Sequence, residues 1–199
     1  MEVHELFKYH THKMVVNDYF GVVLMYYERQ NRYNRAKAVE YAKTYALSPN
    51  PSFKYFSVYE TLGGDCTNFV SQCLLAGGAP MTYTGEHAWW YNKSGTYTTS
   101  DDRWSVAWSV AHSLYWTLKV NNESNNSGVK GQEVSSVSML ELGDVIFYAN
   151  QRGVIFHSAI VTGFSPTATL VSQHTFEARD IPYLKPWLNP RYHYMKIRI

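Results

Sequence analysis

Residues 63–78 read GGDCTNFVSQCLLAGG, and this stretch decides the fold. One Gly-Gly pair precedes Cys66, and a second pair at 77–78 with Pro80 follows a run of helix-compatible residues. The pattern predicts a helix over 66–76 that is capped by Asp65 or Thr67. Because unpaired N–H groups and the helix dipole at that end favour negative charge, Cys66 is expected to ionise readily.

The two cysteines of the chain have different environments. Cys73 lies seven residues after Cys66, roughly 10 Å along the helix axis and beyond disulfide reach, and its apolar neighbours predict a core residue. A lone cysteine is usually buried and inert, but glycines before Cys66 let a substrate backbone approach its thiol. We therefore interpret Cys66 as a nucleophile. Two cysteines also exclude a disulfide scaffold and a four-thiolate zinc site.

The segments around this helix predict an α+β fold. Residues 34–46 are Ala-rich with helical spacing and end before two prolines, and residues 104–118 predict a third helix. The polar stretches 82–103 and 121–131 predict loops. Three β-branched and aromatic runs, 144–149, 154–162 and 168–175, then predict an antiparallel sheet.

One domain is expected over 31–199. Residues 1–30 are expected to form an N-terminal extension, packed on that domain, with a helix or strand near 20–25. The start of the chain lacks the basic and long apolar segments of a signal peptide, and the apolar run 19–27 is too short to cross a bilayer. We expect a soluble protein, which could be the mature part of a longer exported one; its compartment stays unknown.

A cysteine nucleophile needs a base, and His157 is the strongest candidate among eight histidines. It lies on a largely apolar face of a predicted strand, where an imidazole needs a partner. A core histidine with satisfied hydrogen bonds is the competing interpretation. If the chain turns at 163–167, antiparallel pairing sets His157 opposite His174, whereas a shift of one residue sets it opposite Gln173. We favour His174 as the residue that orients the ring.

Composition excludes some classes of function. The formal net charge is only +2 and the positive residues are scattered, so no nucleic-acid partner is expected. The aromatic share of 16%, with 17 Tyr and 6 Trp, favours half-buried rings and a cleft partly lined by them. Predicted substrate contacts are Asp65, Asn68, Trp89 and Trp90. The N–H of Cys66 and the side chain of Asn68 are candidate donors to an oxyanion.

The combined motifs resemble the "putative amidase domain" family of Gram-positive bacteria, which is similar to the NlpC/P60 and CHAP peptidases of the papain-like superfamily. The resemblance covers most of the chain from about Tyr33. It rests on YNR at 33–35, AV at 38–39, YA at 41–42, GDCTNFVSQCL at 64–74, AGG at 76–78, WW at 89–90, LGDVI at 142–146, HSAIV at 157–161 and SQHT at 172–175.

This resemblance implies a papain-like fold, with N-terminal helices and a cysteine at a helix start packed on a C-terminal antiparallel sheet. It implies the catalytic residues Cys66, His157 and His174; Gln173, from the shifted register, is the alternative third residue. It also implies hydrolysis of amide bonds in cell-wall peptidoglycan or its peptides, without a cofactor or metal, and a secreted or wall-associated location. We expect a monomer.

Two other functions are consistent with the sequence. The first is an inactive wall-binding or glycan-binding module on the same fold, in which aromatic rings stack on the ligand; its candidates are Trp89, Trp90, Tyr91, Tyr97 and Trp104. The second is a zinc hydrolase that uses Cys66, His157 and His174 as ligands, although no HExxH motif occurs. Acyl transfer through a thioester on Cys66 is the favoured prediction.

Overall fold

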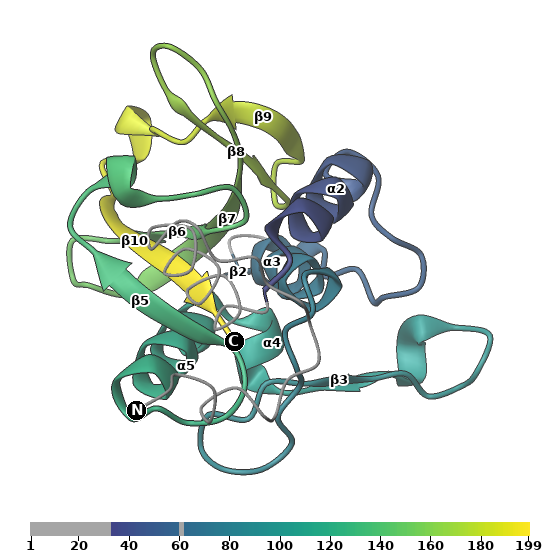
Figure 1. Cartoon of the computed structure of the whole chain (residues 1–199). Helices are drawn as coiled ribbons and strands as arrows, with labels where there is room; N and C mark the ends of the chain where they lie inside the picture. Colours follow the sequence, from purple (N-terminus) through teal and green to yellow (C-terminus); the bar gives the residue numbers. More distant parts are fainter. Residues whose placement is uncertain (1–32, 60–61) are drawn as a thin grey trace, which may run out of the picture. The chain divides into compact units, whose positions relative to one another are not determined.

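The computed structural model of this chain describes residues 33–59 and 62–199 (Figure 1). The predicted extension over residues 1–30 lies outside the described residues. Within them, no helix combines the length and the apolar character needed to cross a membrane.

A six-stranded antiparallel sheet forms the framework of the domain. Its strands follow the spatial order β5-β10-β6-β7-β8-β9, and every neighbouring pair runs antiparallel. The strands are β5 (Lys130–Val134), β6 (Val145–Ala149), β7 (Ile155–Phe164), β8 (Thr169–Gln173), β9 (Ala178–Pro182) and β10 (Arg191–Arg198). The sheet and the helices together confirm the predicted mixed α+β class.

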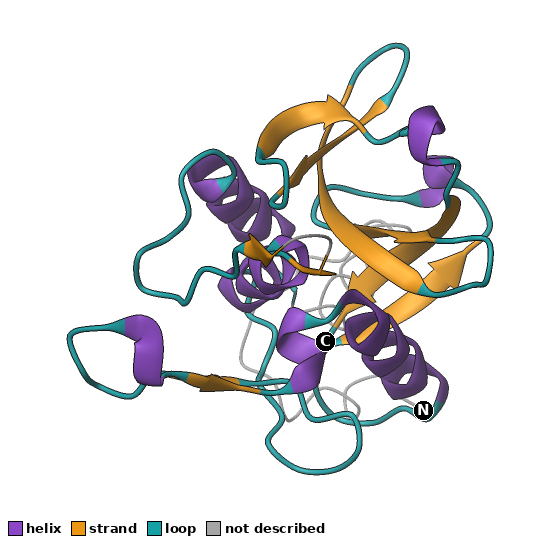
Figure 2. Cartoon of the chain, turned by 180° about the vertical axis from the view of Figure 1, so that it is seen from behind, coloured by secondary structure: helices purple, strands orange, loops and turns teal. Residues whose placement is uncertain are grey.

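The helices pack beside this sheet (Figure 2). They are α2 (Arg35–Tyr45), α3 (Cys66–Ala76), α4 (Val106–Ser109) and α5 (Ala111–Glu123), with short 3₁₀ turns at η2 (Thr99–Asp101), η3 (Val137–Met139) and η4 (Pro186–Leu188). Helix α2 begins where the side chain of Asn34 accepts a hydrogen bond from Lys37 N at 3.0 Å. Both α2 and α3 contact β7, and α5 contacts β5. The helices predicted over 34–46 and 66–76 are confirmed.

The third predicted helix is different in the structure. Trp104 pairs with Tyr91 in a small hairpin of β3 (Tyr91–Asn92) and β4 (Arg103–Trp104), so the predicted loop 82–103 contains two strands. The helical region then breaks at Val110, which has extended backbone angles. Helix α5 continues to Glu123, into the predicted loop 121–131, and the buried side chain of Asn121 in its last turn donates to Val129 O at 3.0 Å. Another short hairpin joins β1 (Val58–Tyr59) to β2 (Leu62–Gly63).

Two apolar clusters make up the core. One lies between the helices and the sheet and includes Phe69, Leu74, Trp108, Phe147 and Ile160. The other includes Ile146, Tyr148, Ala159, Val161 and Val171, which contribute from β6, β7 and β8. Burial of such side chains supplies the main stabilisation of the fold.

Long-range polar contacts join the first helix to the sheet. Arg35 forms an ion pair with buried Asp144 at 2.5 Å and also donates to Leu142 O and Ile197 O. The hydroxyl of Tyr33 donates to Gly143 O at 2.9 Å. These bonds join the YNR segment (33–35) to the LGD segment (142–144), which lie more than 100 positions apart in the sequence. They fix α2, and therefore its neighbour α3, against the sheet.

Candidate active site

Cys66 is the first residue of α3 and is only 7% exposed. Its Sγ lies 3.6 Å from the hydroxyl of Thr67, which in turn is 3.2 Å from the hydroxyl of Ser158 on β7. Burial raises the pKa of the Cys66 thiol, but the charge and hydrogen bond of His157, with smaller contributions from Thr67 and the Ser158 backbone, lower that pKa to about 7. The thiolate is therefore well populated at neutral pH.

The imidazole of His157 is held by Gln173. Nε2 of His157 lies 3.0 Å from Oε1 of Gln173, whose own Nε2 donates to Phe176 O at 3.1 Å and to Thr175 O at 3.5 Å. Because the amide nitrogen donates to these carbonyls, Oε1 accepts, and Nε2 of the ring must carry a proton. In the neutral ring this leaves Nδ1 free to accept the proton of a thiol.

His174 does not orient His157, and that prediction is wrong. Nδ1 of His174 lies 2.5 Å from Oδ2 of Asp65, and Nε2 lies 2.8 Å from Tyr45 O at the end of α2. The ring also stacks on Phe69 with centroids 4.1 Å apart. The structure instead places Gln173, the alternative, beside the catalytic candidate.

The strand register explains this exchange. Ile160 pairs with Ser172 and not with Val171, a shift of one residue in the direction opposite to the one that would set Gln173 directly across from His157, and a bulge follows between Val161 and Gly163. The observed register puts Gln173 on the face that His157 shares, as a diagonal neighbour, and His174 on the other face. Strand β8 ends at Gln173, so the next residue lies in the turn to β9. A shift of one residue moves a side chain to the opposite face of a strand.

Three of the four predicted substrate contacts are internal. Asp65 is buried; its carboxylate accepts from Phe56 N and from the side chain of Asn68, besides its bond to His174. It occupies the N-cap position of α3 without making the predicted side-chain cap. Asn68 is also buried and has all its polar atoms engaged, since its amide donates to Lys54 O and accepts from Trp108 Nε1. These two residues shape the site without offering atoms to a substrate.

The predicted aromatic surface is only partly present. Trp89 is fully buried and donates to the Ser71 hydroxyl at 3.0 Å, and Tyr91 is also buried. Trp90 is half-buried and stacks on Tyr83 with centroids 6.0 Å apart, while Tyr97 is exposed. Of the four predicted contacts, Trp90 alone keeps surface for a ligand. The five rings proposed for a binding module therefore do not form one exposed surface.

The zinc alternative lacks its third ligand in this geometry, because both ring nitrogens of His174 are engaged elsewhere. Across residues 33–59 and 62–199, no three His, Cys, Asp or Glu side chains gather closely enough to hold a metal ion.

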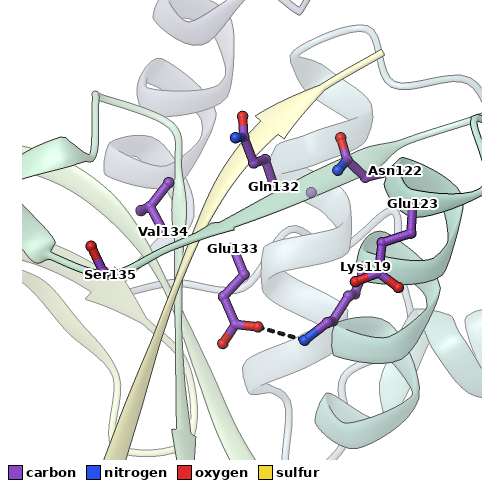
Figure 3. A pocket seen from close by; sticks show the side chains of 8 residues that line it. Lys119, Asn122, Glu123, Gln132, Glu133, Val134 and Ser135 are labelled. Carbon is purple, nitrogen blue, oxygen red and sulfur yellow. Dashed lines mark hydrogen bonds and ion pairs between the residues drawn. The ribbon is translucent and has the colours of Figure 1, made fainter.

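A hollow of about 460 Å³ lies elsewhere, between α5 and β5 (Figure 3). Its main charged pair is Lys119 with Glu133 at 2.8 Å, and the same carboxylate accepts from Tyr115 at 2.9 Å and contacts His193 Nδ1 at 2.7 Å. These groups bond to one another, and neither Cys66 nor His157 lines this hollow.

Sequence reasoning missed Thr175. Its hydroxyl oxygen accepts from Asp65 N at 2.8 Å and from Cys66 N at 3.2 Å, so the predicted oxyanion donor N–H of Cys66 is already bonded. Thr175 and Phe176 have positive φ values of 58° and 68°, an unfavourable conformation for a β-branched and a bulky residue. A Cβ on Gly64 would lie 2.5 Å from the Thr175 hydroxyl, which explains the glycine. The turn between β8 and β9, residues 174–177, contains none of the Gly or Asn residues that usually mark a tight turn.

Gln173 and His174 are expected to give opposite results when replaced. Gln173→Ala should lower kcat roughly 10- to 100-fold while the melting temperature changes little, because the ring of His157 loses its orienting partner. His174→Ala leaves the carboxylate of Asp65 buried without its partner and should destabilise the protein by roughly 3–5 kcal/mol. Steady-state kinetics and thermal unfolding of both variants test this; a stable, slow His174→Ala protein would reverse the assignment.

Residues 32–198 match the family model described as "putative amidase domain", and the chain belongs to this family. The chain is 35% identical over 155 residues to the uncharacterized protein YhbB of Bacillus subtilis strain 168, an alignment that covers 76% of this chain and 44% of that protein. It is 32% identical over 159 residues to the uncharacterized protein YjcM of the same organism, covering 75% of this chain and 32% of that protein. The chain thus spans less than half the length of either relative. No solved structure matches it.

Proposed function

We propose that the protein is a cysteine-dependent amide hydrolase of papain-like architecture that acts on bacterial peptidoglycan or its peptides. The observation that carries this proposal is the thiol of Cys66 at a helix start, with its pKa lowered to about 7 by His157. The orientation of that imidazole by Gln173 supports the same conclusion. Reactive sulfur nucleophiles combine a base within reach with a third group that fixes the base.

The reaction follows from these roles. The Cys66 thiolate attacks the carbonyl carbon, so a C–S bond forms while the carbonyl oxygen becomes an oxyanion. The protonated His157 then gives its Nδ1 proton to the leaving nitrogen, the C–N bond breaks and an amine departs. Water attacks the resulting thioester as His157 takes its proton. The C–S bond then breaks, which releases the acid and the free enzyme.

Thr175 is proposed to stabilise the oxyanion. Its oxygen accepts from two amide groups at the start of α3, which leaves its own proton available next to Cys66. Hydroxyl donors that accept other hydrogen bonds are polarised and donate more strongly.

Thr175→Val should lower kcat about 10²- to 10³-fold with a small change in KM, because one donor to the oxyanion is lost. Thr175→Ser keeps the hydroxyl and is expected to restore activity to within about tenfold of the parent. Because the valine also leaves two amide groups without an acceptor, unfolding and the pH profile of Cys66 alkylation should be measured on both variants. An active Thr175→Val enzyme would remove this role.

The substrate class is tested with purified peptidoglycan. The protein should release new amine groups, and mass spectrometry of the fragments should identify the cleaved amide bond. The Cys66→Ala protein is the matched control and should release none. If the parent protein releases no amine from peptidoglycan or from soluble wall peptides, the wall assignment fails.

A further inference from the structure

Lys185 is the most unusual charged residue near the site. It immediately precedes η4 and is only 6% exposed, yet its Nζ makes no hydrogen bond or ion pair with any described residue. Its backbone N–H is fixed by the hydroxyl of Tyr192 at 2.8 Å. A buried ammonium is costly without an anionic or polar partner.

The aromatic ring of Tyr148 links this amine to His157. Nζ of Lys185 lies 5.7 Å from the centre of that ring, near the outer limit for a cation–π contact. The ring of His157 lies 5.1 Å from the same centre. The ammonium is therefore within about 11 Å of the imidazole, a distance that about three extended residues of a peptide cover.

The amine remains reachable from solvent. Within residues 33–59 and 62–199, the one fully buried side-chain nitrogen or oxygen that lacks a hydrogen bond is Oδ1 of Asp180. Because Nζ of Lys185 has no hydrogen bond and is not fully buried either, the small exposed part of this residue includes its nitrogen. Burial lowers the pKa of Lys185, because the charged amine loses part of its hydration in the free protein. A bound anion would offset that cost.

We propose that Lys185 is a substrate-binding residue that pairs with a carboxylate of the peptide on the His157 side of the cleaved amide bond. The inference rests on the proposed function and adds a chemical requirement to it: the substrate is an anionic peptide. The carboxylate is either the free C-terminus or an acidic side chain, and both offer the same paired oxygens to an ammonium.

Binding is measured by calorimetry on the Cys66→Ala protein, so the test does not depend on turnover. The probes are the wall tetrapeptide Ala-γ-Glu-Lys-Ala with free carboxylates and two versions, one amidated at the Glu α-carboxylate and one at the C-terminus. One amidated version should bind roughly 10- to 100-fold more weakly than the free acid, and which one it is identifies the carboxylate.

Lys185→Met in the same background should weaken binding of the acid by a similar factor and remove the difference between the acid and that amide. Methionine preserves the buried stem, and Lys185→Arg retains the charge and should keep the preference. Lys130→Met is the matched control: it removes a positive charge from β5, separated from β7 by β10 and β6, and should change nothing.

Equal affinity for acid and amides, no binding of any probe, or an unchanged preference in Lys185→Met would overturn the inference. Failure of the proposed function is distinguishable, because it is read from amine release by the protein that retains Cys66. If the protein hydrolyses amide bonds but shows no preference for a carboxylate, the proposed amidase function stands and only the proposed role of Lys185 is wrong.

Discussion

Replacement of Cys66 by serine is expected to reduce amide hydrolysis by at least about 10³-fold, with the fold unchanged. A hydroxyl at this position has nearly the same size, but its proton is far harder to remove than that of a thiol whose pKa is about 7. The initial rate of amine release measures the effect. Intact-protein mass spectrometry during turnover should also detect an acyl adduct on the parent protein, mapped to Cys66.

Cys73→Ala is the matched control for this variant. Cys73 lies on the same helix but is fully buried, and burial raises the pKa of its thiol well above the ordinary value. It should not react, and its replacement should cost some stability without removing activity. An acyl adduct on Cys73, or an active Cys66→Ser protein, would contradict the cysteine mechanism.

Replacement of His157 by alanine should abolish the low pKa of Cys66. In the parent protein the pKa of the thiol is lowered from 9.0 to about 7, so the rate of alkylation by iodoacetamide should rise with pH and reach half its maximum near pH 7. Without the imidazole, burial still raises the pKa, and the midpoint should move above 9. At pH 7 the alkylation rate should fall roughly 50-fold or more, since each pKa unit changes the thiolate fraction about tenfold.

Hydrolysis should fall further than alkylation in His157→Ala, by at least about 10³-fold, because the leaving amine also loses its proton donor. His193→Ala is a useful comparison, since His193 lies on β10, contacts Glu133 beside the hollow between α5 and β5, and has no role in the proposed site. A midpoint that stays near pH 7 in His157→Ala would mean that another group activates the thiol.

Parts of the fold were predictable because their local signals agree with the tertiary structure. Helix α3 follows directly from the Gly-Gly pairs on both sides of it, and strands β6, β7 and β8 follow from apolar runs. Strands β5, β9 and β10 were not predicted, because segments such as Lys130–Val134 are partly exposed and rich in polar residues. Only pairing with a neighbouring strand gives such segments their conformation.

The candidate nucleophile and the candidate base could be predicted from the sequence, whereas the residues that surround them could not. Cys66 and His157 carry recognisable chemistry, and the structure brings them together. The choice between Gln173 and His174 depended on a strand register that bulges alter, which period-two patterns cannot reveal. Thr175 was missed because its role depends on a turn whose sequence is unlike the usual one.

The bond between Asp65 and His174 joins residues 109 positions apart, and it has a consequence for biosynthesis. Asp65 precedes Cys66, the proposed nucleophile, and the proposed base His157 and its partner Gln173 also come from the last third of the chain. While the ribosome is still making that part, the emerging thiol has no partner and should behave as an ordinary cysteine. We expect hydrolytic capacity to arise only when the last strands have assembled, so unfinished chains should be harmless to amides around them.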